Sequence, residues 1–212
     1  PDKFILSYCD RALGITSAEE QPVLPKGNNL SLHLLELFTS QVAKVGMTDG
    51  IRQVLQEESD ALRAYYEQAG ILIARPAGGT SCRLAISAKG GTNAENHNHN
   101  DVGSYAVALG SETMVGDQGG PNSYPGDYFN GDAPQKYKIK GSFGHPVPVV
   151  DGRTQSSGGK AKGVVLQKEF TNEKDVFSID YTSAYSTPNL DKLIRTFVYD
   201  RQGEGNFTVG DE

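Results

Sequence analysis

Residues 163–182 have the sequence GVVLQKEFTNEKDVFSIDYT, in which two apolar-rich runs flank a short polar segment. The runs Gly163–Phe170 and Asp175–Thr182 are rich in β-branched and aromatic residues, and Asn172-Glu173-Lys174 lies between them. Such residues favour extended backbone, and polar residues between two extended runs are typical of a hairpin turn. The stretch therefore predicts an antiparallel β-hairpin.

The same pattern recurs along most of the chain. Gln202-Gly203-Glu204-Gly205 and Gly110-Ser111 are further turn segments between strand-like runs. The strand-like runs outside the first hairpin are Ile71–Ala74, Cys82–Ile86, Ser104–Val115, Val147–Val150, Leu193–Asp200 and Phe207–Val209. Short strands at this frequency predict a mainly β fold, an antiparallel β-sandwich.

Residues 1–70 follow a different period. Apolar residues recur at near-helical spacing from Leu34 to Val45 and from Ile51 to Tyr66, and Gly46 and Gly70 follow as stops. We expect a helical packing segment over residues 1–70, followed by a β-sandwich domain over residues 71–212. The chain starts at Pro1 and ends just as a strand finishes. We therefore expect a piece of a longer protein, with later strands of the sandwich missing.

The composition argues against several classes of partner. The net charge is -6, and no run of Lys or Arg is present, so we expect no nucleic-acid partner. The alternation in Lys136–Lys140 indicates an exposed strand or loop. No stretch of apolar residues is long enough to span a membrane. Cys9 and Cys82 lack the spacing of a zinc motif, and their pairing stays open.

A polar segment, His97-Asn98-His99-Asn100-Asp101, is the strongest candidate for chemistry. If it forms a strand, His97 and His99 lie on the same face, because side chains alternate with a period of two. The return strand of the 104–115 hairpin would bring Asp117 beside His99, and His145 follows a long loop. Two imidazoles and a carboxylate are a common ligand set for Zn²⁺, and Fe(II) is the chemical alternative.

Four segments in order resemble motifs of the heparinase II/III-like polysaccharide lyases. They are Ala69–Arg75, similar to the strand that opens the family's β domain; His97–Tyr105, similar to H-x-H-x-D-x-x-S-F; Met114–Gly119, similar to a strand ending in D-x-G; and Ser142–Gly152, similar to S-x-x-H-N-x-x-x-V-D-G. Together they cover roughly residues 69 to 155.

The resemblance implies a lyase that cleaves uronic-acid-containing polysaccharide by β-elimination. Residues 1–70 would be the end of an (α/α) toroid, and the β domain would be a supersandwich-like fold. His99, Asp117 and His145 would bind a structural zinc ion, while His97 would be catalytic and neutralise the uronate carboxylate. A periplasmic or secreted location and an acidic polysaccharide partner are also implied. Whether the chain forms a homo-oligomer is left open.

The chain departs from the family pattern in two ways. Pro146 stands where the family has Asn after the third His, and the toroid that supplies the Tyr and His acid and base is mostly absent. We therefore expect the lyase to be inactive as this fragment. Substrate contacts are expected from residues near the presumed cleft, namely Asn96, Asn98, Tyr124 and Tyr128.

Two other classes of protein compete with the lyase. Gly91 and His97-x-His99 match the start of a cupin metal motif, but the Glu expected a few residues later is missing. A non-catalytic carbohydrate-binding β-sandwich is the second alternative. Such modules bind sugars through exposed aromatic rings, and this chain has no Trp.

Overall fold

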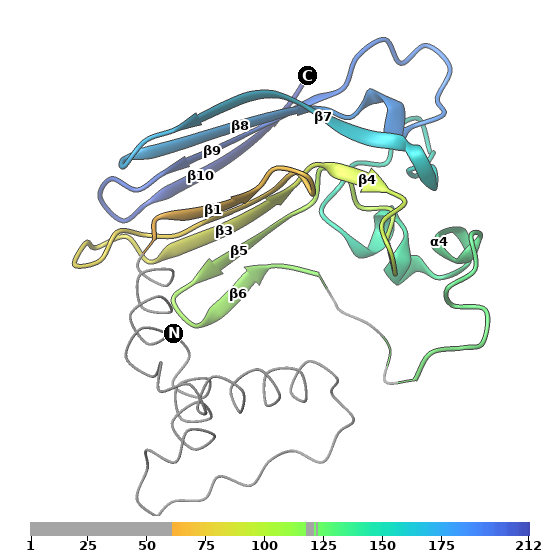
Figure 1. The fold of residues 1–212 in the computed structure, drawn as a ribbon, viewed down its shortest axis with the longest axis horizontal. Coiled ribbons are helices and arrows are strands. Elements are labelled where there is room, and N and C mark those ends of the chain that lie inside the picture. The colour runs from red at the N-terminus through yellow and green to blue at the C-terminus, as the bar shows by residue number, and fades with distance from the viewer. Residues whose placement is uncertain (1–60, 118–120, 122) are drawn as a thin grey trace, which may run out of the picture. The chain divides into compact units, whose positions relative to one another are not determined.

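Two antiparallel five-stranded sheets form the framework of the computed structural model, which describes residues 61–117, 121 and 123–212 (Figure 1). The first sheet has the order β1 (Arg63–Tyr66), β2 (Ile71–Ala74), β3 (Leu84–Lys89), β5 (Tyr105–Leu109) and β6 (Glu112–Val115). The second has the order β10 (Asn206–Asp211), β9 (Ile194–Asp200), β8 (Lys174–Asp180), β7 (Gly158–Phe170) and β4 (Gly91–Asn93). The predicted antiparallel β-sandwich is confirmed.

The core lies between the two sheets, where aromatic rings from opposite layers meet. The ring of Tyr65 on β1 lies 5.8 Å from that of Phe177 on β8, and Tyr105 on β5 lies 6.0 Å from Phe197 on β9. Burial alternates residue by residue along β9, so every second side chain faces the first sheet. Burial of this apolar surface is the main force that holds the layers together.

One continuous segment contributes a strand to each of the two sheets. β3 of the first sheet ends at Lys89, and β4 of the second begins at Gly91, so Gly90 alone separates them. Gly91 has φ +66°, and a Cβ there would lie 2.6 Å from the carbonyl oxygen of Ala69. Only glycine fits this backbone and this space. The switch delivers the chain to the end of the sandwich, where the histidine-containing segment begins.

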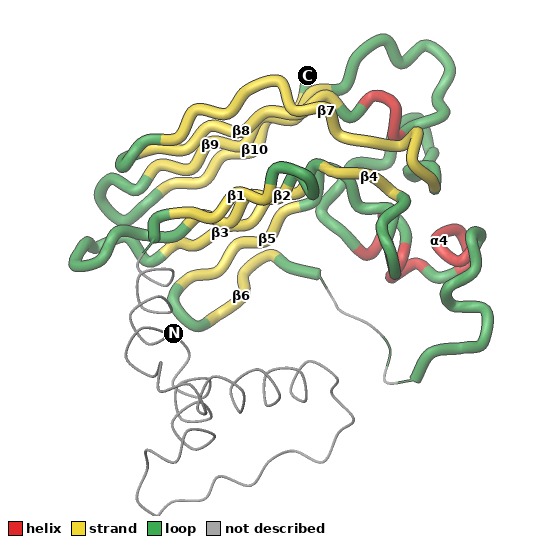
Figure 2. Tube along the Cα trace, viewed as in Figure 1, coloured by secondary structure: helices red, strands yellow, loops and turns green. Residues whose placement is uncertain are grey.

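The three predicted hairpins are confirmed. β5 pairs with β6, β7 with β8, and β9 with β10, each in antiparallel register around the predicted turn. The predicted strand Ile71–Ala74 is β2, while the run from Cys82 begins its strand only at Leu84. Figure 2 shows that strands are the main regular secondary structure of the described chain and that its helical turns are short.

Some of the predicted elements are wrong. Arg63–Tyr66 was expected to end a helix, but it forms β1, because its residues pair with β2 and the Tyr65 ring packs into the core. Val147–Val150 was expected to be a strand, but only Val150 forms a bridge, to Arg153. Pro146 and Pro148 have no N–H to donate to a strand ladder. The remaining predicted helices, in residues 1–60, lie outside the described residues.

A helical stretch follows the long loop after β6. It consists of the one-turn helix α4 (Ala133–Lys136) and the 3-10 turns η1 (Lys138–Lys140) and η2 (Ser142–Gly144). The prediction of an exposed strand or loop at 136–140 is wrong, since the segment forms these turns and Lys140 is buried. In the described part of the chain, no helix has the length and apolar character needed to cross a membrane. Cys9 lies outside that part, and Cys82 is a buried free thiol.

Candidate metal centre

The segment 94–104 that carries His97 and His99 is a closed loop between β4 and β5. Its two ends are joined by the side chain of Asn93, whose Oδ1 accepts a hydrogen bond from the backbone N–H of Asp101 at 3.1 Å. His97 has φ +58°, in the left-handed region. The prediction that His97 and His99 lie on one face of a strand is therefore wrong, because the loop turns between them.

A buried glutamine holds this loop against the sandwich. Gln155 Oε1 accepts hydrogen bonds from Asn93 Nδ2 at 3.0 Å and from the backbone N–H of Val102 at 3.1 Å. Its Nε2 donates to the Val102 carbonyl at 2.7 Å, and its own carbonyl accepts from Asn100 Nδ2 at 3.0 Å. Gln155 is 1% exposed. A buried network of this kind fixes a backbone conformation, because any broken member leaves an unsatisfied group.

The loop places His99 beside Asp117 and His145. The Nδ1 atom of His99 lies 3.1 Å from Nε2 of His145 and 4.0 Å from Oδ2 of Asp117, and His145 Nδ1 lies 3.4 Å from the same oxygen. One ligand atom from each residue can be chosen so that all three lie within 4.8 Å of one another. The group could hold a metal ion, as the sequence predicted.

Each member of the group comes from a different element. Asp117 follows the return strand β6, as expected, and its side chain is 49% exposed. His145 follows η2, and its side chain is almost fully buried. His99 is half-buried in the loop after β4. The exposed carboxylate beside two sheltered imidazoles leaves one side of the group open to solvent.

Arg195 on β9 ties two of these segments to the second sheet. Its Nη1 donates hydrogen bonds to the carbonyl of Gly103 in the histidine loop and to that of Pro146, both at 2.8 Å. Its other nitrogens form a two-point ion pair with Asp211, at 2.7 and 2.6 Å. The planar guanidinium can make both sets of contacts at once, which lysine cannot do.

The surroundings of His99 favour its neutral form. Burial lowers the pKa of His99, and the neighbouring His145 lowers it further, against the opposing effects of Asp117 and Asp101. A neutral imidazole has a lone pair, which metal coordination requires. The electrostatics are therefore compatible with a ligand role at neutral pH.

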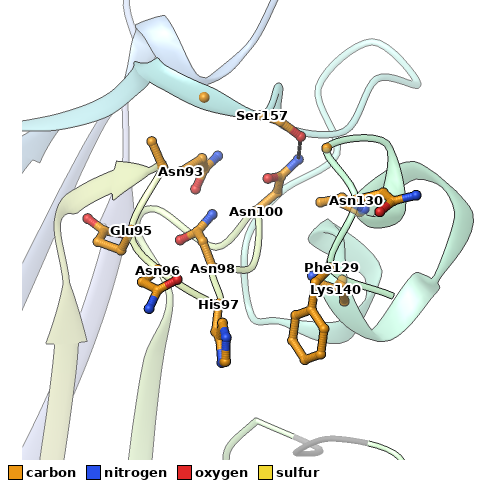
Figure 3. Close-up of a pocket in the computed structure, with 14 residues that line it drawn as sticks. Asn93, Glu95, Asn96, His97, Asn98, Asn100, Phe129, Asn130, Lys140 and Ser157 are labelled. Carbon is orange, nitrogen blue, oxygen red and sulfur yellow. Dashed lines mark hydrogen bonds between the residues drawn. The ribbon is translucent and has the colours of Figure 1, made fainter. Parts of the chain in front are cut away.

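Two pockets flank the histidine loop. A pocket of about 280 Å³ is lined by both histidines and by Lys89 and Asp101, which form an ion pair at 2.6 Å. A larger pocket of about 730 Å³ shares Glu95, Asn96, His97 and Asn98 with it. Figure 3 shows its lining, which includes Asn93, Glu95, Asn96, His97, Asn98, Asn100, Phe129, Asn130, Lys140 and Ser157.

Of the remaining predicted site residues, some line these pockets and others do not. Asn96 and Asn98 line both pockets, as does His97, whose ring stacks on Phe129 with centroids 4.6 Å apart. Tyr124 is exposed and Tyr128 is buried, with their rings 5.0 Å apart. Neither tyrosine belongs to the lining of the two pockets. Their predicted contact with substrate stays a prediction.

Sequence reasoning missed three residues that shape the centre: Lys140, Gln155 and Arg195. Gln155 and Arg195 act through hydrogen bonds to segments more than 45 residues away in the chain. No local pattern marks such residues. For Lys140 a local signal did exist, since Gly141 and Gly144 follow it closely and argue against a regular strand.

Comparison with known proteins returned no match to a family model and none to a curated protein. The chemistry of the site therefore rests on its own residues.

Proposed function

We propose that this chain is the metal-binding β-sandwich part of a polysaccharide lyase that cleaves uronic-acid-containing polysaccharide by β-elimination. The observation that carries the proposal is the group His99, Asp117 and His145, together with His97 of the same loop as His99, which lines two pockets. This arrangement matches the separate roles that the four motifs imply for the two histidines.

Zinc is the metal that we propose for the centre. Two imidazoles and a carboxylate suit Zn²⁺, whose ligand atoms in a tetrahedral site are about 3.3–3.4 Å apart, given bond lengths near 2.0–2.1 Å. The closest pair, at 3.1 Å, is near this spacing, and Asp117 is exposed enough to rotate toward the imidazoles. A zinc ion bound there would be held by His99, Asp117 and His145 and would cross-link the three segments that carry them.

The role proposed for His97 follows from the chemistry of the substrate. The C5 proton of a uronate is weakly acidic while the neighbouring carboxylate keeps its charge. A hydrogen-bond donor that neutralises this carboxylate stabilises the charge that develops as the proton leaves. His97 lines both pockets and stacks on Phe129, so its ring is held at the surface of the loop where a sugar can reach it.

The general base is proposed to lie in another part of the full-length protein. Burial raises the pKa of Tyr128, and it raises that of Tyr185 to about 12. A hydrogen bond to Asp127 raises the pKa of Tyr137. These phenols stay protonated near neutral pH and cannot accept a proton there. The described tyrosines with shifted pKa values are therefore poor bases.

The cupin alternative requires His97 and His99 to bind one metal together. The group that could hold a metal contains His99 but not His97, whose ring lies against Phe129. This separation favours the lyase over the cupin.

The test of the proposed function is a lyase assay on the full-length protein. Incubation with alginate and with a panel of glycosaminoglycans should generate unsaturated uronate ends, detected as ultraviolet absorbance of the new C4–C5 double bond. His97→Ala should abolish the absorbance gain while leaving the metal in place. No gain on any of these polymers would reject the lyase for those substrates. Binding without cleavage would instead favour the non-catalytic carbohydrate-binding module.

A further inference from the structure

Lys140 is a buried lysine in the wall of the larger pocket. It ends the 3-10 turn η1 and is 3% exposed. Its Nζ donates one hydrogen bond, to the carbonyl of Tyr128 at 2.8 Å. An ammonium group carries three N–H donors, so two remain for another acceptor.

No carboxylate balances this charge within the described residues. None lies within ion-pair distance of Nζ, whose other neighbours are the rings of Tyr128 and Phe129, with centroids 4.8 and 5.1 Å away. Burial lowers the pKa of Lys140, and no nearby acid offsets this effect. Buried charges in proteins are normally paired, so a lysine in this position indicates a missing anionic partner.

A second observation comes from the asparagines of the same pocket. Asn100 is 1% exposed, and its Nδ2 donates to Gln155 O at 3.0 Å and to Ser157 Oγ at 3.1 Å, which fixes the direction of its amide. Its Oδ1 is buried and has no hydrogen-bond partner among the described residues, and the same holds for Asn98 Oδ1. Figure 3 shows both side chains between Glu95 and Asn130. Unpaired acceptors of this kind suit the hydroxyl groups of a ligand.

The pocket also offers an apolar surface. Phe129 is 49% exposed and stacks on His97 of the histidine loop, and both rings line the pocket. The backbone adds a direct link, since Asn100 N donates to the carbonyl of Lys140 at 2.8 Å. Lys140 is therefore held in register with the histidine loop.

We propose that the larger pocket is a sugar-binding subsite in which Lys140 binds the anionic substituent, a carboxylate or a sulfate, of a sugar next to the one that His97 contacts. The subsite rests on the proposed function, because it takes an acidic polysaccharide as the ligand. Asn98 and Asn100 accept hydrogen bonds from the sugar hydroxyls, and Phe129 packs against the ring. The pocket volume of about 730 Å³ accommodates more than a single small ion.

The test is titration calorimetry of the full chain with defined oligosaccharides, which needs no catalytic turnover. The probes are a neutral glucan, an unsulfated uronate-containing oligosaccharide and a sulfated one. Lys140→Met removes the charge and keeps the apolar stem, and it should weaken binding of the acidic probes at least about ten-fold. Lys138→Met, at an exposed position on the same turn, is the matched control and should change affinity less than about two-fold.

The two acidic probes distinguish the anion. Loss of affinity for the sulfated probe alone assigns Lys140 to sulfate, and equal loss for both assigns it to the carboxylate. Unchanged binding of both probes by a folded Lys140→Met protein overturns the subsite. If that variant does not fold, Lys140→Arg and Lys140→Gln replace it, and the subsite requires tighter binding by the arginine variant. Failure of the unaltered protein to bind any acidic probe would reject the proposed substrate class and the subsite together.

Discussion

Arg195 Nη1 lies 2.8 Å from the carbonyl oxygen of Pro146, and the residue that follows the candidate ligand His145 is thereby fixed to strand β9. The same nitrogen reaches Gly103 in the histidine loop. Two of the three segments that form the candidate metal centre are thus held by one side chain of the second sheet. The centre depends on the sandwich for its geometry, and several consequences can be measured.

The first prediction concerns the ligands themselves. Protein purified without a His tag should contain about one equivalent of zinc, and His99→Ala and Asp117→Ala should each lose most of it, because three protein ligands are needed to retain the ion. His97→Ala is the matched control and should keep the metal. The measurement is elemental analysis of dialysed protein. Retention of zinc by His99→Ala would show that the ligand assignment is wrong.

The second prediction concerns Arg195. Arg195→Met should destabilise the protein by about 2–3 kcal/mol, less than for a fully buried ion pair because Asp211 is 36% exposed. It should also weaken zinc binding, since the segments of His99 and His145 lose their common anchor. Arg153→Met removes an exposed arginine and should stay within about 0.5 kcal/mol of the original protein. Urea unfolding and a zinc competition titration measure the two effects, and equal behaviour of both variants would contradict the prediction.

The third prediction concerns the buried glutamine. Gln155→Leu leaves both backbone groups of Val102 without their partner, at about 1–3 kcal/mol for each unsatisfied group, and removes one of the two hydrogen bonds of Asn93 Nδ2, which keeps its bond to the Ser156 carbonyl. We expect a loss of at least about 3 kcal/mol in urea unfolding, given that partial relaxation reduces the sum. Gln202→Leu, at an exposed position, serves as the control. A Gln155→Leu protein as stable as this control would show that the network contributes little.

The fourth prediction concerns acid. Burial alone would raise the pKa of Asp211, but its hydrogen bonds and charge pairing with Arg195 outweigh this and lower it. A lowered pKa in the folded state contributes stability that is present above the unfolded value, about 3.9, and is lost as the pH falls below it. Asp211→Asn should therefore be less stable at pH 7 and show a smaller further loss between about pH 5 and pH 3. Parallel stability curves for the two proteins would contradict this.

Local patterns predicted most of the described fold. The hairpin at 163–182 and the one around Gly110 have alternation and turn residues within a few positions of each other, so sequence was sufficient. β1 was missed because Arg63–Tyr66 is strand only by pairing with β2, and a helical period continued into it from residue 51. Pairing with a neighbouring strand in the tertiary structure can override a helical pattern of apolar residues in the sequence.

Part of the candidate site was also predictable from the sequence, and part was not. His99, Asp117 and His145 were predicted because motifs marked each one, and the structure brings them together. The loop conformation at His97 was not predictable, since it depends on Gln155 and Arg195, which are distant in sequence. The burial of Lys140 depends on the loop residues Tyr128 and Phe129 folding over it. Contacts between residues that are distant in the sequence produce no periodic pattern in it.

The passage of the chain from β3 to β4 through Gly90 has a mechanical consequence. The histidine loop continues from β4 of the second sheet and leads into β5 of the first, so a force applied to the loop is shared by two hydrogen-bonded ladders. A sliding motion between the layers would have to tear this shared segment from one of them. The two sheets therefore resist displacement of the loop together, and neither sheet does so alone.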